Sequence, residues 1–385
     1  MDLVIAKKDL ERLVSRCQGV ADKRSAMPAL SNVLLAAEGN TLHVSATDMF
    51  LSVSGQVAAE VTSAGSIAVP ARDLLERIKH MPDGRVQVMT NQGASTVLKA
   101  VGSPRRYTLH GIPGTEFPAL PKPDQAAATL RLPVELMRTL IQRTHFSISP
   151  DETRAHVNSA LFEWAGDRVR MVTTDGHRLS KMESTVEGTN ATATMLIPMK
   201  AIQELRRLCD EARAEKIAAS DDGPKEPMLS ISQSGPNAFF EIGDTRFSVK
   251  LVDAQFPPYS QVIPRASERS IRAPRRGLAD ALDAVRLAAS DRTGGVKLST
   301  APGLLRITSE SPESGNAIDE IPVDFNGAEV TIGFNAKYFL DVLGALDAEE
   351  EILLGISGEL DPATLRPASE SATSDYVAVV MPMRI

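Results

Sequence analysis

The sequence predicts an α+β fold in which one chain contains three similar units. A weak internal repeat divides the 385 residues into thirds. Amphipathic helical segments occur twice in each third, and short alternating segments with Gly-containing turns between them are typical of antiparallel strands. A chain of this length also suits two or three domains of about 100 to 150 residues each.

The repeat is visible in strand-like segments that recur in the same order. The first third has 31–35, 42–48 and 67–70, and then a Phe-Pro segment at 117–121. The second has 158–162, 169–175 and 196–198, and then a Phe-Pro segment at 256–259. The last, more divergent third has 295–298, 304–308 and 330–334. Asp48 and Asp175 occupy equivalent places, 127 residues apart.

Two segments in each third have the i, i+3, i+4 spacing of a helix with one apolar face. The first helices have apolar positions at Leu10, Leu13, Val14 and Cys17, at Leu136, Leu140 and Ile141, and at Leu278, Ala281, Leu282 and Val285. The second helices have them at Leu74, Leu75 and Ile78, at Ile202, Leu205 and Cys209, and at Phe339, Val342, Leu343 and Leu346. Polar Pro-, Ala- and Ser-rich stretches predict boundaries that give units 1–127, 128–265 and 266–385.

The composition argues against several classes of protein. A net charge of −7 argues against adhesion of the whole surface to nucleic acid, although it leaves room for a local basic face. No apolar run approaches the roughly 20 residues that span a bilayer, and the N-terminus does not resemble an export signal, so we expect a cytoplasmic protein without membrane contact. Cys17 and Cys209 fall on apolar helix faces, which predicts buried thiols and no metal or cofactor.

Cations recur opposite the apolar faces of the predicted helices. A turn of about 100° per residue places them toward solvent. They are Lys8, Arg12 and Arg16, then Arg72 and Lys79, Arg138, Lys200 and Arg207, and Arg276. They could simply solvate the helices, and Glu204, Glu211 and Asp283 interrupt these faces. Their recurrence favours a surface that holds a polyanion without reading bases, and an aromatic content of 4% favours duplex over single-stranded nucleic acid.

Four motifs carry a resemblance that covers the whole chain. They are Thr-Thr-Asp-Gly-His-Arg-Leu at 173–179, Phe-Pro-Pro-Tyr at 256–259, Ile-Gly-Phe-Asn-Ala-Lys-Tyr at 332–338 and Val-Val-Met-Pro-Met-Arg-Ile at 379–385. In this order they resemble the bacterial DNA polymerase III beta subunits, the sliding clamps. The resemblance implies three clamp domains, a head-to-tail homodimeric ring around double-stranded DNA, and a non-catalytic role in processive replication.

The resemblance also assigns residues to DNA contact and to ring closure. Arg24 matches a DNA-contacting arginine, and Lys200 and Arg207 match cations of the inner surface. Asp151 stands where well-known members have an amide near DNA. The positions that match the dimer interface are Tyr107 and Leu109 on an edge strand of the first unit and Leu287 and Ala288 on the third.

The resemblance further implies a cleft between the second and third units that captures short peptides. Its expected partners are the polymerase III catalytic subunit, the clamp loader, translesion polymerases and mismatch-repair proteins. The matching residues are Arg154, Val157, Thr174, Gly176, His177, Arg178, Leu179, Pro257, Val262, Asn335, Tyr338, Pro362, Val379, Val380, Met381, Pro382, Met383 and Arg384. Flexible methionines suit varied apolar anchors, and Gln261 replaces an arginine common in the family.

Plainer interpretations compete with these assignments. Asp175-Gly176 fits a hairpin turn, and the C-terminal segment fits a last sheet strand. A hydrolase that uses Asp175 and His177 is disfavoured, because two residues provide neither a nucleophile with an oriented base nor three metal ligands. A scaffold that binds peptides but never DNA is a second rival.

Overall fold

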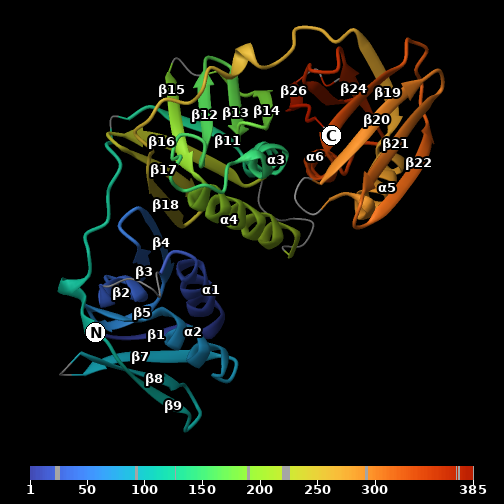
Figure 1. Cartoon of the computed structure of the whole chain (residues 1–385). Helices are drawn as coiled ribbons and strands as arrows, with labels where there is room; N and C mark the ends of the chain where they lie inside the picture. Colours follow the sequence, from blue (N-terminus) through green and yellow to red (C-terminus); the bar gives the residue numbers. More distant parts are fainter. Residues whose placement is uncertain are drawn as a thin grey trace. The chain divides into compact units, whose positions relative to one another are not determined.

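The computed structural model describes residues 1–21, 27–91, 94–125, 127–188, 191–218, 226–290, 294–369, 371 and 373–384. In this part of the chain there are six α-helices and four antiparallel sheets (Figure 1). The predicted α+β class is therefore confirmed. Each third contributes two helices, as the apolar periodicity predicts.

The elements of the three repeats follow one order. The first contains β1 (Asp2–Ala6), α1 (Lys7–Gln18), β2 (Asn32–Glu38), β3 (Thr41–Thr47), β4 (Leu51–Ala58), β5 (Glu60–Ser63), β6 (Gly65–Pro70), α2 (Ala71–Lys79), β7 (Arg85–Asn91), β8 (Ser95–Ala100), β9 (Arg106–His110) and β10 (Ile112–Pro113). The second contains β11 (Thr129–Pro133), α3 (Val134–Thr144), β12 (Ser159–Ala165), β13 (Arg168–Thr174), β14 (Arg178–Thr185), β15 (Thr192–Pro198), α4 (Met199–Ala218), β16 (Met228–Ser234), β17 (Asn237–Ile242) and β18 (Thr245–Lys250). The third contains β19 (Arg269–Pro274), α5 (Arg275–Val285), β20 (Gly295–Ala301), β21 (Leu304–Ser311), β22 (Gly315–Pro322), β23 (Val330–Asn335), α6 (Ala336–Ala345), β24 (Glu351–Ile356), β25 (Ala363–Pro367) and β26 (Ser374–Val380).

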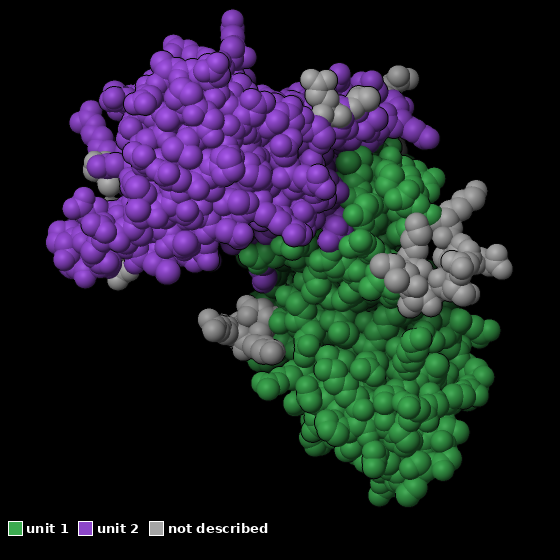
Figure 2. Space-filling model, turned by 90° about the vertical axis from the view of Figure 1, so that its right-hand side faces the viewer, with its two compact units in different colours: residues 1–137, 203–251 green, residues 138–202, 252–385 purple. Residues whose placement is uncertain are grey.

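The chain forms two compact units, which Figure 2 shows in different colours. Unit 1 comprises residues 1–137 and 203–251, and unit 2 comprises residues 138–202 and 252–385. Unit 1 contains a sheet of order β5-β1-β7-β8-β9 and one of order β10-β6-β2-β3-β4-β18-β17-β16-β11. Unit 2 contains sheets of order β15-β12-β13-β14-β26-β25-β24-β19 and β22-β21-β20-β23.

The units cut across the sequence repeats because strands of two repeats join in one sheet. In unit 1, β4 of the first repeat pairs with β18 of the second. In unit 2, β14 of the second repeat pairs with β26 of the third. The domain boundaries expected near Ala127 and Arg265 remain predictions, because the compact units follow the sheets, and two of these sheets combine strands of neighbouring repeats.

Helix burial follows the apolar periodicity closely. Leu10, Leu13, Val14 and Cys17 of α1 are buried, and so are the predicted positions of α2, α4, α5 and α6. In α3, Met137 is buried and Leu136 is only half-buried, contrary to the prediction. Both cysteines are buried free thiols, and burial raises the pKa of Cys17 to about 12. Among the described residues, no helix combines the length and apolar character needed to cross a membrane.

Candidate functional site

The candidate peptide site starts at the turn between β13 and β14. Asp175 Oδ1 accepts hydrogen bonds from the backbone N–H groups of His177 and Arg178 at 2.9 and 3.0 Å. Thr174 Oγ1 accepts from Gly176 N and donates to Arg178 O. Gly176 has a φ of 94°, which favours glycine. The segment is therefore a hairpin turn, as the plainer interpretation proposed. The Asp175 carboxylate is engaged in the hydrogen bonds of this turn.

A cleft of about 280 Å³ opens beside this turn. Its floor is apolar and buried, with Val157, Leu179 and Val379 each at most 3% exposed. Two flexible or branched side chains at the rim remain accessible, Met381 at 38% and Val262 at 41%. The lining comprises Arg154, His156, Val157, Thr174, Gly176, Arg178, Leu179, Pro257, Tyr259, Val262, Val379 and Met381. An apolar floor with a polar, adaptable rim is suited to an apolar anchor side chain.

The floor belongs to a larger apolar cluster on one face of the eight-stranded sheet. The cluster is formed by the buried residues Leu161, Val172, Leu179, Leu196, Val377 and Val379. Val252, Phe256, Tyr259 and Ile263 from the segment after β18 pack against it. The segment that supplies the Pro257 and Val262 wall is therefore anchored by hydrophobic burial.

Polar contacts fix the same wall through Tyr259. Its hydroxyl accepts a hydrogen bond from Arg170 at 2.7 Å and donates one to Glu163 at 3.0 Å. Arg170 also binds Glu183, with Nε 2.6 Å from Oε2. Burial opposes ionisation of Glu183, but hydrogen bonds from Arg170 and Arg168 outweigh it and lower its pKa. Tyr259 and His156 were missed by sequence reasoning, although Tyr259 ends the Phe-Pro-Pro-Tyr motif.

Arg178 is an internal connector and not an open rim charge. Its guanidinium binds Asp175 at 3.0 Å and Asp341 of α6 at 2.6 Å. It also donates to Phe146 O and lies 4.6 Å from the ring centre of Tyr338. The residue is 9% exposed, so these groups consume its donors. Its cleft role is to hold the turn and α6 together, a role that sequence periodicity could not reveal.

The C-terminal segment forms part of the cleft and part of the sheet. Val379 and Val380 are fully buried in β26. Beyond the strand, Met381 N donates to His177 O at 2.9 Å and Met383 N donates to Gly333 O at 2.8 Å. The valines are therefore sheet core, as the plainer interpretation predicts, and Val379 and Met381 line the cleft, while peptide binding at this end stays a prediction.

Several predicted cleft residues do not line the 280 Å³ space. They are His177, Asn335, Tyr338, Pro362, Val380, Pro382, Met383 and Arg384. Asn335 caps α6 by accepting from Lys337 N, and Tyr338 supports Arg178. His177 is exposed beside the opening.

Asp151 orients Arg154 at the cleft. Its carboxylate accepts hydrogen bonds from the backbone N–H and the hydroxyl group of Thr153, and it pairs with Arg154 at 2.8 Å. Hydrogen bonds from Thr153 and then from Arg154 lower the pKa of Asp151. The Arg154 side chain remains 47% exposed, which leaves it accessible to a ligand. Gln261 is exposed in the same wall as Val262.

The predicted cations differ widely in exposure. Lys8, Arg72, Lys79, Lys200 and Arg276 are exposed on their helices, as the periodicity predicts. Arg12, Arg138 and Arg207 are half-buried. Arg24 lies outside the described residues.

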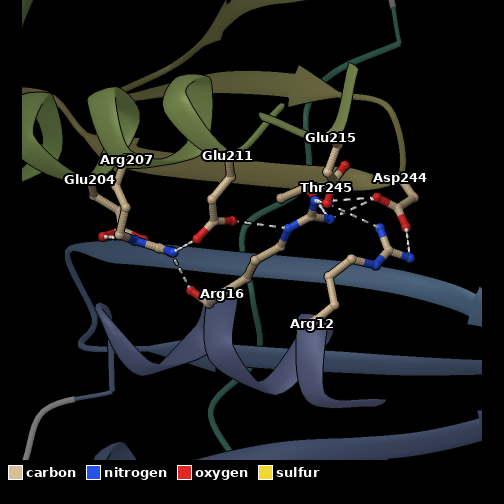
Figure 3. Close-up of polar contacts among 8 residues, drawn as sticks. All are labelled: Arg12, Arg16, Glu204, Arg207, Glu211, Glu215, Asp244 and Thr245. Atoms are coloured by element: carbon tan, nitrogen blue, oxygen red, sulfur yellow. Dashed lines mark hydrogen bonds and ion pairs between the residues drawn. The ribbon is translucent and has the colours of Figure 1, made fainter. Parts of the chain in front are cut away.

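The predicted solvent-facing position of Arg16 is wrong. Arg16 is 6% exposed, because carboxylates of α4 and of the β17–β18 turn enclose its guanidinium. Figure 3 shows Arg12 and Arg16 extending from α1 toward these carboxylates. Arg207 is also held internally, by Glu204 and Glu211. A single helix wheel cannot anticipate a second helix that covers its polar face.

The predicted interface residues lie on one sheet edge and beside another. β9, with Tyr107 and Leu109, ends the five-stranded sheet, and β22 ends the four-stranded sheet next to Leu287 and Ala288. Leu287 is 77% exposed, whereas Leu109 and Ala288 are buried in their own chain at 3% and 5%. The side chains of Leu109 and Ala288 are therefore not available to a second chain.

The described residues contain no group of three or more His, Cys, Asp or Glu side chains that could hold a metal ion. Asp175 is engaged by the turn and by Arg178. The proposed hydrolase pair of Asp175 and His177 therefore gains no support from the geometry.

Comparison with known proteins identifies relatives along the whole length. Models of the DNA polymerase III beta subunit match as N-terminal domain at 1–121, central domain at 131–258 and C-terminal domain at 260–384. The beta sliding clamps of Pseudomonas putida and Caulobacter vibrioides are 31% and 30% identical, with 100% of both chains covered. The crystal structure of the DNA polymerase III subunit beta from Pseudomonas aeruginosa has a TM-score of 0.90 at 29% identity and 100% coverage of both chains.

Three consecutive clamp domains define a non-catalytic clamp of DNA replication. The chain belongs to the DNA polymerase III beta subunit family, the beta sliding clamps. Family membership makes it a processivity subunit of a DNA-directed DNA polymerase, in agreement with the function predicted from the sequence.

Proposed function

We propose that two copies of the chain close head to tail into a ring around duplex DNA. The observation that carries the proposal is a strand-pairing rule inside the chain. β4 of the first repeat pairs with β18 of the second, and β14 of the second pairs with β26 of the third. By the same rule, β22 of the third repeat would pair with β9 of the first repeat in another copy. A head-to-tail contact of this kind closes into a ring of two copies only if the rotation at each joint fits.

Charge on the two open edges supports this pairing. β9 exposes Arg106 and His110, with Arg105 directly before it. β22 exposes Asp319 and Glu320, with Glu313 two residues before it. Opposite charges on two unpaired edges favour their association and disfavour pairing of either edge with itself. The resulting head-to-tail contact is heterologous, as ring closure requires.

The exposed helix cations support DNA as the polyanion. Lys8, Arg72, Lys79 and Arg276 form no ion pair with other described residues, so they can exchange counterions for phosphates. Contact with phosphates alone carries no base information, and a closed ring can remain on DNA with weak, diffuse attraction. We further propose that the protein acts in the cytoplasm of a bacterial cell, where replication takes place.

The ring is tested by topological retention. The purified chain, loaded by a clamp loader onto nicked circular DNA, is expected to stay bound during gel filtration and to leave when the DNA is linearised. A scaffold that binds peptides but not DNA would show no difference between the two forms. A stable monomer at micromolar concentration in sedimentation would also contradict the ring.

We propose that the cleft captures short linear peptides of the polymerase III catalytic subunit, the clamp loader, translesion polymerases and mismatch-repair proteins. The buried apolar floor and the accessible Met381 and Val262 suit an apolar anchor, and Arg154 can bind an acidic or carbonyl group of the peptide.

Deletion of residues 381–385 tests the docking cleft. We expect a Gln-rich, Leu-Phe-containing polymerase tail peptide to lose at least about tenfold in affinity, equivalent to about 1.4 kcal/mol. The melting temperature should change modestly, since Met381 is 38% exposed. Fluorescence anisotropy, thermal melting and dimer mass report these quantities. Phe50→Ser, which removes an exposed apolar side chain outside the cleft, is the control. Unchanged peptide affinity in a truncated dimer would exclude docking at this end of the chain.

A further inference from the structure

The arginines of α1 are covered by acidic side chains from the second repeat. We call this group the α1–α4 clasp, and Figure 3 shows its members, Arg12, Arg16, Glu204, Arg207, Glu211, Glu215, Asp244 and Thr245. Arg16 binds Glu215 at 2.6 Å, Asp244 at 3.0 Å and Glu211 at 3.3 Å. All members lie in unit 1. They join the N-terminal family domain to the central one.

The clasp is also closely packed around Arg207. Arg207 binds Glu204 and Glu211 and donates to the backbone O of Arg16 at 2.8 Å. A Cβ on Gly19 would lie 2.4 Å from Glu204 Oε2, so a larger residue where α1 ends would displace this carboxylate. Glu204 is 7% exposed, and a carboxylate buried to this extent needs a cation beside it, which Arg207 provides.

The clasp depends on the unusual length of α4. The equivalent helices α2 and α6 have 9 and 10 residues, whereas α4 has 20. Glu211 and Glu215 lie in the additional length. The extension therefore brings two carboxylates to α1 that a helix of the usual length for this repeat would not supply.

The two α1 arginines are held differently. The Arg16 side chain is 7% exposed and has four polar partners, so it cannot turn toward an outside phosphate without breaking the clasp. The Arg12 side chain is 29% exposed and has longer contacts, 3.3 Å to Asp244, 3.8 Å to Asp9 and 3.9 Å to Glu215. Partly exposed pairs of this kind are weak and open to competition by other anions.

We propose that the clasp carboxylates Glu215 and Asp244 compete with DNA phosphates for Arg12, and that Arg16 is an internal anchor between the two domains. The proposal rests on the proposed DNA-encircling function. A phosphate that displaces Asp244 from Arg12 leaves that carboxylate to Arg16, so the anchor is kept while Arg12 is released. The acidic extension of α4 thus reduces how strongly this helix holds DNA, as a sliding protein requires.

The test is the salt dependence of binding to a short duplex, measured by fluorescence anisotropy. In the Glu215→Gln/Asp244→Asn variant we expect the slope of log K against log salt to steepen by about 0.9, the value for one additional phosphate contact. Arg12→Ala should remove this gain, so its effect on the slope should be larger in the variant than in the unmodified chain.

The control is Glu241→Gln/Glu351→Gln, which changes net charge equally. Each of these carboxylates pairs with a single strand arginine, at 2.6 Å to Arg246 and 3.0 Å to Arg272. Equal slopes in control and variant, or an Arg12→Ala effect of the same size in both backgrounds, would overturn the proposal. If the double variant melts below the assay temperature, Asp244→Asn alone replaces it, because it removes the shortest Arg12 contact and leaves Glu211 and Glu215 on Arg16. Retention of the unmodified chain on nicked circular DNA tests the ring separately.

Discussion

Two turns of the chain share one pattern of backbone hydrogen bonds but differ in the environment of their side chains. The first turn is Thr47–Leu51 between β3 and β4, and the second is Thr174–Arg178 between β13 and β14. In each, the aspartate Oδ1 accepts two backbone N–H groups. In each, the threonine hydroxyl accepts one N–H and donates to the carbonyl that closes the turn. Both have a third residue at positive φ, Met49 at 76° and Gly176 at 94°.

The side chains that follow the aspartate differ in their environment. Met49 and Phe50 are 57% and 65% exposed, and Lys250 lies 5.9 Å from the centre of the Phe50 ring. In the second turn, Arg178 turns inward to Asp341, and the turn lines a cleft. The Thr-Asp pair therefore specifies the repeated backbone, and the next three residues with their tertiary partners decide whether a site forms.

The largest expected difference concerns the closing residues, Arg178 and Leu51. Arg178→Ala leaves Asp175 without its buried cation and should cost about 3 kcal/mol, the low end of the range because Lys337 still pairs with Asp341. Leu51→Ala in the first turn should cost a similar amount through its cavity. Only Arg178→Ala should abolish peptide binding. Urea unfolding and anisotropy measure both; equal peptide loss in the two variants would show a general stability effect.

Tyr259 provides a second difference between the two repeats, because the equivalent position of the first repeat is Leu120, which has no hydroxyl group. Tyr259→Phe keeps the ring on the apolar cluster and removes the hydrogen bonds to Arg170 and Glu163. The lost hydrogen bonds to charged groups contribute about 1.5 kcal/mol to folding, so the melting temperature should fall. Peptide affinity should also fall, by roughly tenfold, because the Pro257 wall loses its polar anchor. An unchanged affinity would mean that apolar packing alone positions the Pro257 wall.

Exchanging the positive-φ residues tests whether the backbones are equivalent. Gly176→Ala should cost about 1 kcal/mol, because an L side chain is disfavoured at this φ although its Cβ has room. Met49→Gly should gain roughly 0.5 kcal/mol, since relief of the same strain exceeds the entropy cost of glycine. Denaturant midpoints of both variants provide the measurement. A stabilising Gly176→Ala or a destabilising Met49→Gly would contradict the shared geometry.

The smallest expected effect is a pH dependence confined to the second repeat. Gln56 occupies the place of Glu183, five residues after the close of the turn. The pKa of Glu183 is lowered from its ordinary 4.5, so its stabilising contribution is present above pH 4.5 and is lost as pH falls through the lowered pKa. Glu183→Gln should flatten the acid limb of stability below about pH 4.5. An unchanged acid limb would show that other carboxylates dominate it.

The motifs predicted much of the cleft because it is formed by short segments whose residues act locally. Thr174, Gly176, Leu179, Pro257, Val262, Val379 and Met381 line it as expected. Tyr259 was missed because its function depends on Arg170 and Glu163 across the sheet. The inward orientation of Arg178 depends on Asp341, 163 residues further along the chain.

By itself the sequence determined the α+β class, the repeat, the apolar helix faces and the two buried cysteines. These follow from periodicity and residue type, which act within a few neighbouring residues. Only the tertiary structure decided that sheets join neighbouring repeats, that Arg16 is enclosed by α4, and which motif residues line the cleft. Burial of a charge depends on whether distant carboxylates approach it, and no local pattern in α1 contains Glu211, Glu215 or Asp244.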